Sequence, residues 1–324
     1  MSARPVVLTG ATGFVGSAVL RELTARPELR VRVVGRTEPP AQQGAAPVEF
    51  VPADLAEPGS LAGVCAGADV VVHAATYIGP DEERCRTVNQ LGSARLVREA
   101  AEAGVGRLVL LSTAAVYGEG PHRGIEVDEV APAPVSAVSR SRLAAEGEFR
   151  AAGGTVLRPG LVLGRGDRWV VPALAELVAR VPARWEGGAG LHSVVAVDDL
   201  ARLIAAVATS AEPVAGVHHA SHPVPVSTGD LLDVLAAHGV LPPTEGDLPT
   251  EGDLPWDRCL EQLRANPGVV SERQFSLLAR DHWYRSEDVW RAARCDPGPS
   301  ALRRVAEAAD WYREFVHGRA GDDD

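Results

Sequence analysis

The stretch TGATGFVG, residues 9–16, decides the fold of this chain. It is a GxxGxxG array that follows the apolar run PVVLTG (5–10) and opens the helical pattern SAVLRELTAR (17–26). Such glycines permit a tight turn, close approach of the main chain to a pyrophosphate, and close packing of helix on strand. The helix N-terminus then supplies N–H donors to the phosphates. We therefore expect a dinucleotide site lined by Gly10, Thr12, Gly13, Phe14, Val15 and Gly16.

Short apolar runs alternate with helical patterns through the first two thirds of the chain. After the first run come the runs at 31–35, 48–55, 69–75, 107–113 and 155–162. Helical stretches such as QLGSARLVREAAEAG (90–104) lie between them. Near-continuous β-branched runs that alternate with helices are typical of βαβ units and of a parallel sheet covered on both faces. The pattern predicts a Rossmann-type, doubly wound α/β fold.

The pattern changes after residue 165, where Trp, Pro and Gly become frequent. Five of the six Trp lie beyond position 184, and TEGDLP is repeated directly at 244–255 as a duplicated loop. Helical patterns return at 198–208, 257–265 and 301–316. We assign residues 1–164 and 191–217 to the dinucleotide-binding domain, residues 165–190 and 218–320 to a smaller, mainly helical substrate cap, and residues 321–324 to a disordered tail.

The residue after the second apolar run indicates which dinucleotide binds. NAD sites favour an acidic residue about 20 positions after the glycines, because it accepts a hydrogen bond from the ribose 2′-hydroxyl. This chain has Gly35 and Arg36 there instead. Arg36 is suited to pair with a 2′-phosphate, and Gly35 leaves room for that group. We therefore expect NADP(H) as the cofactor.

Composition argues against several classes of binding partner. The net charge of −11 and a pI of about 5.3 give no electrostatic support to a nucleic-acid partner. No apolar run is long enough to span a bilayer, so we expect no membrane partner. The four Cys residues are scattered and form no CxxC pair, which is typical of a reducing cytoplasm and argues against a structural zinc site. The oligomeric state is open.

These motifs resemble the extended short-chain dehydrogenase/reductases of the NAD-dependent epimerase/dehydratase type, over most of the chain. Beyond the glycine array, the resemblance rests on VVHAAT (71–76), on Asn89, on LSTAAVYG (111–118), on LRPGLVLG (157–164) and on VDDLA (197–201). It implies that Asp54 and Leu55 lie near the adenine. It also implies that Ala74 and Ala75 line the cofactor, and that Pro159 and Leu161 lie near the nicotinamide.

The family resemblance also implies a catalytic set that this chain lacks in part. In the family, a Ser or Thr on the fifth strand acts with a Tyr-x-x-x-Lys on the next helix, and the Tyr gives its proton to the carbonyl oxygen. Thr113 matches the Ser/Thr. Aligning SRLAAE (141–146) with the family's SKLAAE places Arg142 at the Lys and Val138 at the Tyr. Val138 has no proton to give, whereas Arg142 keeps a charge for the ribose.

The sequence offers few other proton donors. It has no lysine, so a shifted copy of the pair does not exist. Tyr117, in the VYG motif, has the right chemistry, but the resemblance implies a structural role for it. Tyr77 and His192 are weaker candidates for residues that line the substrate pocket. HHASHP (218–223) has no adjacent acidic or thiol ligand, so we expect no metal site.

The substrate itself is the donor that remains. A phenol has a pKa of about 10, close to that of a Tyr side chain. When the phenol is ortho or peri to a ketone, its effective concentration makes it a competitive acid. Aromatic polyketides have that arrangement, and among reductases of this superfamily that lack the Tyr the chain looks most like the angucyclinone ketoreductases. The resemblance implies a ketoreductase of an aromatic, angucyclinone-type polyketide ketone in antibiotic biosynthesis. Two alternatives stay open: an NADP-binding pseudo-enzyme or sensor, and a nucleotide-sugar ketoreductase or epimerase.

Overall fold

A computed structural model describes residues 4–41, 47–242 and 254–319. The expected tail at 321–324 and most of the repeat at 244–255 lie outside the described residues. No helix in the described ranges is long and apolar enough to cross a membrane.

A seven-stranded parallel sheet forms the centre of the N-terminal part. Its order is β11-β7-β5-β4-β1-β2-β3, and every neighbouring pair is parallel. The strands are β1 (Arg4–Thr9), β2 (Leu29–Gly35), β3 (Glu49–Pro52), β4 (Val70–His73), β5 (Arg107–Leu111), β7 (Thr155–Arg158) and β11 (Gly216–His219). The prediction of a doubly wound α/β fold is confirmed. Chain order reverses between β1 and β4, and such a reversal marks where open α/β sheets bind ligands, outside the carboxyl ends of the strands.

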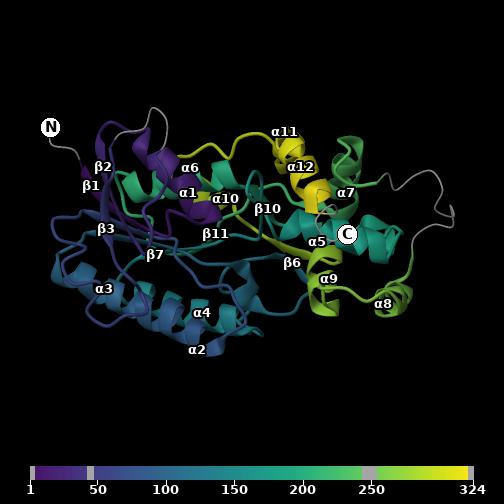
Figure 1. The fold of residues 1–324 in the computed structure, drawn as a ribbon, viewed down its shortest axis with the longest axis horizontal. Coiled ribbons are helices and arrows are strands. Elements are labelled where there is room, and N and C mark those ends of the chain that lie inside the picture. Colours follow the sequence, from purple (N-terminus) through teal and green to yellow (C-terminus); the bar gives the residue numbers. More distant parts are fainter. Residues whose placement is uncertain (1–3, 42–46, 243–253, 320–324) are drawn as a thin grey trace.

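Helices cover both faces of this sheet (Figure 1). On one face, α1 (Phe14–Thr24) packs with α6 (Val197–Thr209) against the buried core of the sheet. On the other face lie α3 (Gly92–Glu102) and α4 (Ala137–Ala151), which pack over residues such as Val71. Helices therefore shield both faces of the sheet from solvent, which explains why its central strands appear in the sequence as continuous apolar runs.

The second part of the molecule is mainly helical and has its own core. Trp185, Phe275 and Tyr312 are fully buried there. The helices of this part are α5 (Val170–Arg180), α7 (Thr228–Ala237), α8 (Trp256–Ala265), α9 (Glu272–Ala279), α11 (Ala301–Glu307) and α12 (Ala309–Arg319). Helix α10 (Glu287–Ala292) packs instead into the core of the large sheet, through Val289 and Trp290. The boundaries that we assigned between the domain and the cap stay a prediction.

Two small sheets join the parts. In one, β8 (Leu161–Leu163) pairs with β10 (Val194–Ala196). The other has the order β12-β9-β13-β6, built from β6 (His122–Ile125), β9 (Leu191–His192), β12 (Val226–Ser227) and β13 (His282–Tyr284). The sequence did not predict the strands of this four-stranded sheet, because they are too short and too rich in His to form an apolar run.

Two predicted elements are each split in the structure. The run at 155–162 forms two strands, because Pro159 and Gly160 interrupt it. A Cβ on Gly160 would lie 2.2 Å from the Ser193 carbonyl oxygen, so the chain turns where only glycine fits. The pattern at 301–316 breaks at Ala308 into α11 and α12. The break allows the buried Tyr312 hydroxyl to accept a hydrogen bond from Gly164 N–H (2.7 Å).

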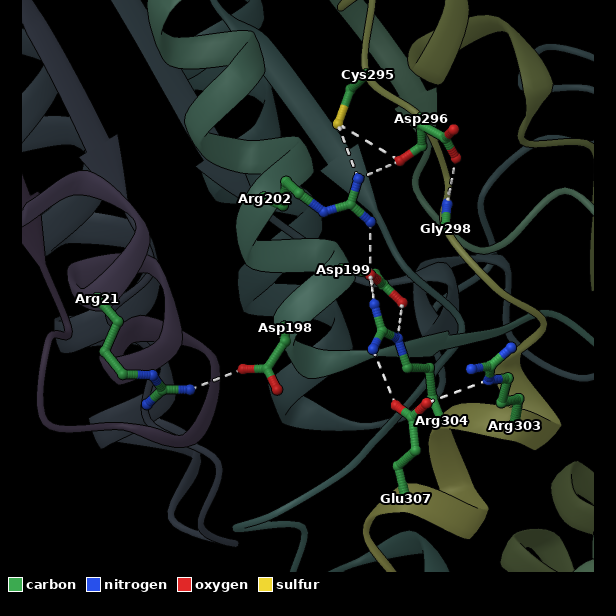
Figure 2. Close-up of polar contacts among 10 residues, drawn as sticks. All are labelled: Arg21, Asp198, Asp199, Arg202, Cys295, Asp296, Gly298, Arg303, Arg304 and Glu307. Carbon is green, nitrogen blue, oxygen red and sulfur yellow. Dashed lines mark hydrogen bonds and ion pairs between the residues drawn. The ribbon is translucent and has the colours of Figure 1, made fainter. Parts of the chain in front are cut away.

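A cluster of charged side chains ties the C-terminal helices to the dinucleotide-binding part (Figure 2). Asp199 on α6 is buried, and its carboxylate accepts two hydrogen bonds of 2.9 Å from Arg304 on α11. It also accepts one of 2.5 Å from Arg202, which in turn donates to the main-chain oxygen of Asp296. The buried Asp199 carboxylate thus binds two guanidinium groups where the dinucleotide-binding part meets the C-terminal helices.

Candidate active site

The glycine loop is built so that only glycine fits at two of its positions. Gly10 has φ +78°, and a Cβ there would lie 2.5 Å from the Ala75 nitrogen. A Cβ on Gly16 would lie 1.9 Å from the Gly10 carbonyl oxygen. Helix α1 begins at Phe14 with Gly13 as its N-cap residue, and no side chain caps its first N–H groups. These donors are the ones that a helix N-terminus offers to a phosphate.

The adenine end of the expected site lies after strands β2 and β3. Arg36 follows β2 directly and is exposed, and within the described residues it takes part in no hydrogen bond or ion pair. A Cβ on Gly35 would meet nothing within 4 Å. Asp54 accepts a hydrogen bond of 2.9 Å from the Ala56 N–H and so shapes its own turn. Leu55 lies against the first residue of α3, since a Cβ on Gly92 would approach it to 2.8 Å.

The buried side-chain amide of Asn89 holds the segment that follows β4. Ala74 and Ala75 follow the strand and lie against the glycine loop. Asn89, on a π-helix (η1, Cys85–Leu91), accepts from Tyr77 N–H (2.7 Å) and donates to the Tyr77 carbonyl (2.9 Å). It also donates to Ser141 Oγ on α4 (2.9 Å). Asn89 therefore ties the cofactor-side segment to the helix that carries Val138 and Arg142.

Thr113 lies just beyond the carboxyl end of β5. Its backbone is extended, and it forms the N-cap of a 3₁₀ turn (η2, Ala114–Tyr117). Its Oγ1 accepts a hydrogen bond of 3.1 Å from Ala115 N–H, which leaves the hydroxyl proton free to donate. The next residue, Ala114, donates its N–H to the carbonyl of the buried Pro159 (2.8 Å). The strand-end segments expected near the nicotinamide thus lie side by side, with Leu161 opening β8.

Helix α4 brings Val138 and Arg142 to the same strand end. Val138 lies in its first turn and is partly exposed. Arg142 Nη2 donates to the main-chain oxygens of Leu111 (2.9 Å) and Ser112 (2.7 Å), next to Thr113. Burial lowers the pKa of Arg142 to about 10, and its neighbour Glu146 acts in the opposite direction. The guanidinium therefore stays charged at neutral pH.

A small recess lies beside Arg142, between the ends of β4 and β5. Its polar lining includes His73, Thr76, Asn89, Ser93 and Ser112. The recess has room for about one water molecule. Because both hydrogens of Arg142 Nη2 are used by carbonyl groups, its Nε and Nη1 protons remain for a ligand at this edge.

Tyr117 lies in the interior, behind the strand ends, and is saturated with hydrogen bonds. Its hydroxyl accepts from Arg158 Nη1 (2.8 Å) and lies 2.8 Å from His219 Nε2 and 3.0 Å from the Val127 carbonyl. His219 Nδ1 lies 3.1 Å from the Arg285 carbonyl and can donate to it, so the one hydroxyl proton of Tyr117 is shared between the Val127 carbonyl and His219 Nε2. Burial raises the pKa of Tyr117. In this position Tyr117 does not face the edge where a ketone would bind.

The two other candidates for the substrate pocket lie in different places. His192 on β9 is buried, and its Nε2 lies 2.8 Å from Thr228 Oγ1. Burial lowers the pKa of His192 to about 3. Tyr77 is partly exposed in the segment after β4, with the Arg84 guanidinium 4.9 Å from its ring centre. Of these two, only Tyr77 lies at the carboxyl edge of the sheet.

A buried ion pair lies beside the site, and it was not identified from the sequence. Glu146 and Arg158 are both buried and share a bidentate contact, with Arg158 Nη2 2.5 Å from Glu146 Oε2. Glu146 also accepts a hydrogen bond from Ser112 Oγ. The pair links three elements of the site. These are α4, which carries Arg142, β7, which directly precedes Pro159, and the end of β5, which precedes Thr113. Among the described residues, no group of three or more His, Cys, Asp or Glu is arranged to hold a metal.

Comparison with known proteins gives a family match. A model of the NAD dependent epimerase/dehydratase family matches residues 6–219. The 2-alkyl-3-oxoalkanoate reductase of Stenotrophomonas maltophilia is 30% identical over 195 residues, which is 53% of this chain and 54% of that protein. A 4-hydroxy-2-methyl-3-oxo-4-farnesyl-3,4-dihydroquinoline-1-oxide ketoreductase of Stigmatella aurantiaca is 30% identical over 201 residues, 57% of this chain and 59% of that protein. The chain thus spans about half the length of these relatives.

Solved structures share the fold over nearly the whole chain. MoeE5 in complex with UDP-glucuronic acid and NAD has a TM-score of 0.73 at 21% identity, over 96% of this chain and 99% of that one. UDP-glucuronic acid 4-epimerase from Bacillus cereus in complex with NAD has a TM-score of 0.71 at 17% identity, with the same coverage. At such identities the likeness concerns the fold alone.

Proposed function

The chain belongs to the NAD dependent epimerase/dehydratase family, and we propose that within it the protein is an NADPH-dependent ketoreductase of an aromatic, angucyclinone-type polyketide in antibiotic biosynthesis. The observation that carries this proposal is the sequence of the first turn of α4, where the family alignment leads us to expect an acid and the chain has Val138. Two relatives with the names of reductases of oxo compounds support the reaction class. The family's coarser activity, an oxidoreductase or epimerase that uses a nicotinamide dinucleotide, agrees with the glycine loop at α1.

The preference for NADPH rests on Arg36. Its guanidinium is exposed at the end of β2, and the neighbouring Gly35 leaves space beside it. No acidic side chain stands at either position to accept from a ribose 2′-hydroxyl. A 2′-phosphate offers Arg36 a charge-assisted, bidentate contact that the 2′-hydroxyl of NADH does not.

The proton for the carbonyl oxygen comes, in this proposal, from the substrate. When bound, the cofactor supplies the hydride to the carbonyl carbon. The carbonyl oxygen takes the proton of a neighbouring phenol on the same molecule, which leaves an alcohol and a phenolate that water reprotonates. Tyr117 is excluded as donor by its place in the interior, where its hydroxyl is bonded to Arg158 and His219. The protein's own task is therefore to orient the ketone rather than to protonate it.

Two residues orient the reacting groups. Thr113 has a free hydroxyl proton at the end of β5 and donates it to the carbonyl oxygen, which increases the partial positive charge on the carbonyl carbon. Arg142, held by the Leu111 and Ser112 carbonyls, offers its remaining N–H groups to the nicotinamide ribose. Its charge also favours the phenolate that forms nearby, because opposite charges attract more strongly away from bulk water.

Mixing the protein anaerobically with NADPH and candidate ketones tests the reaction class. Loss of NADPH absorbance with formation of the alcohol is the expected result for a tetralone that has its phenol peri to the ketone. Tight NADPH binding without turnover on any aromatic ketone would instead identify a sensor or pseudo-enzyme. Turnover of a UDP-sugar in the same assay would favour the nucleotide-sugar alternative, although such a substrate has no phenol to give the proton.

A further inference from the structure

One exposed aromatic side chain follows a strand end of the candidate site. Among the described residues, the exposed large hydrophobic residues are Val48, Ile78, Val135, Trp169, Val224 and Val269. Ile78 and Val224 follow β4 and β11 of the large sheet, whereas Trp169 follows β8, the strand that Leu161 opens. Trp169 is the one aromatic residue among these exposed side chains of the described ranges.

Trp169 is the largest of these exposed side chains, and its backbone is rigid. It is 64% exposed, whereas the other five Trp are buried or partly buried. Its N–H donates to the Asp167 carboxylate (2.8 Å), which also accepts from the N–H groups of Val170 and Val171 and so caps α5. Asp167 is buried and accepts a further hydrogen bond of 3.1 Å from Tyr312 on α12. An exposed aromatic ring on a fixed backbone is suited to binding, because little conformational entropy is lost.

The loop that carries Trp169 lies over the cofactor loop. Gly166 is so near Phe14, the first residue of α1, that a Cβ on Gly166 would approach the Phe14 ring to 3.0 Å. Three residues later Trp169 precedes α5, the first helix of the mainly helical part. The neighbouring Arg168 has its guanidinium 5.9 Å from the ring centre of Phe315 on α12. Trp169 thus stands between the expected phosphate site and the helices that face the sheet edge.

We propose that Trp169 is the residue that selects a flat aromatic substrate, by stacking its indole ring on the fused rings of the ligand. Offset stacking stabilises aromatic pairs beyond the burial of area alone, and a saturated ligand of equal size gains only the burial. This inference rests on the proposed function for its choice of substrate class. It adds a specificity-determining side chain that lies outside the Thr113, Val138 and Arg142 set.

Calorimetric titration of the full chain, saturated with NADP+, tests this role without requiring turnover. The probes are a hydroxyanthraquinone with its phenol peri to a ketone, and decalone as a saturated ketone. We expect Trp169→Ala to weaken hydroxyanthraquinone binding about tenfold, and Trp169→Phe to restore most of that affinity. The affinity for decalone should fall less than that for the hydroxyanthraquinone, because decalone loses only the burial of area, and the affinity for NADP+ should stay unchanged. The matched control is Val269→Ala, because Val269 is 90% exposed but lies between α8 and α9, away from the sheet edge.

The outcomes separate this inference from the proposed function. Equal hydroxyanthraquinone affinity in the wild type and Trp169→Ala overturns the role of Trp169, even if NADPH is oxidised. Absence of hydroxyanthraquinone binding to the wild type overturns it too. Binding that depends on Trp169 without any NADPH oxidation supports the inference and contradicts the ketoreductase. In an active enzyme, the same substitution should raise the KM for the aromatic ketone about tenfold and leave kcat within about twofold.

Discussion

The Tyr117 hydroxyl accepts a hydrogen bond of 2.8 Å from Arg158 in the interior, at the end of the 3₁₀ turn that Thr113 caps. Because its hydroxyl is held by Arg158, we propose that Tyr117, the tyrosine of the VYG motif, does not give its proton to the substrate. We predict that Tyr117→Phe retains activity within about threefold, because the phenol delivers no proton to substrate. The same substitution should lower the free energy of unfolding by about 1–3 kcal/mol, since it leaves a buried polar partner unsatisfied. Urea unfolding and steady-state NADPH oxidation measure the two effects.

Thr113→Val is the informative comparison for Tyr117→Phe, because it removes one hydroxyl at nearly constant volume. We expect kcat to fall about 100-fold, since the carbonyl loses the donor that polarises it in the transition state. Thr113 is partly exposed, so stability should change little. A large loss of activity in Tyr117→Phe, with little loss in Thr113→Val, would reverse the roles that we assign to the two residues.

Arg36→Ala tests the preference for NADPH. Loss of a charge-assisted contact with the 2′-phosphate should raise the KM for NADPH about 10- to 100-fold. The KM for NADH should stay nearly constant, because its ribose has no phosphate for Arg36 to bind. Arg98→Ala, which removes an exposed charge from α3, is the control for a general effect of net charge. Equal changes in the KM for both cofactors would contradict the assignment.

Much of this fold was predictable from the sequence, because the central strands of the large sheet, such as β4 and β7, are buried on both faces and appear as apolar runs. The glycine array predicted a tight turn and close helix–strand packing, and Gly10 and Gly16 lie in close contact in the structure. The alignment that placed Arg142 at the family's Lys did not specify its contacts, which lie at the end of β5. The small sheet with His122 and His192 was not predictable, since its pairings join strands of two to four residues that lie far apart in the chain. Long-range pairings of this kind leave no local periodicity.

The partners of buried polar groups were also beyond prediction from the sequence. The alignment SRLAAE placed Arg142, but nothing in it indicated that Glu146 pairs with Arg158 or that Tyr117 is enclosed by them. A side chain's role depends on which way it points from its element, and that direction is set by packing across the whole domain. For this reason the sequence alone leaves Tyr117 among the possible proton donors, whereas its hydrogen-bond partners in the structure argue against that role.

Asp199→Asn tests the contact that joins the two parts of the molecule. It leaves Arg202 and Arg304 without their shared charge, and we expect a loss of about 2 kcal/mol in the free energy of unfolding. The loss should be smaller than for a fully enclosed pair, because the two guanidinium side chains are 30% and 31% exposed. Asp198→Asn is the matched control: Asp198 pairs with Arg21 at the surface, so its loss should be under about 1 kcal/mol (Figure 2). Equal losses in the two variants would contradict this account.

The buried histidines should make stability fall in acid. Burial lowers the pKa of His73 and His219 to about 4 and that of His192 to about 3, from an ordinary value of 6.5. Below pH 6.5 the unfolded chain therefore binds protons that the folded chain does not. Each histidine should remove about 1.4 kcal/mol of stability per pH unit below 6.5, down to its folded pKa, with no effect above 6.5.

Urea unfolding at several pH values between 7.5 and about 5 measures this slope. His192→Gln should make the slope less steep, because one depressed pKa is removed. Stability that stays constant from pH 7 to about 5 would show that these imidazoles are protonated as readily in the folded chain as in the unfolded one.

The most direct test of the central claim compares a ketone that has a peri phenol with the methyl ether of the same ketone, in the wild-type protein. We propose that Val138 stands where the family has its acid; a Val side chain has no proton to give, so the methyl ether should be reduced at least about 100-fold more slowly. Calorimetry should show that both compounds bind to the NADP+-saturated protein, so that the difference lies in kcat. Equal rates of NADPH oxidation on the two ketones would contradict proton transfer from the substrate.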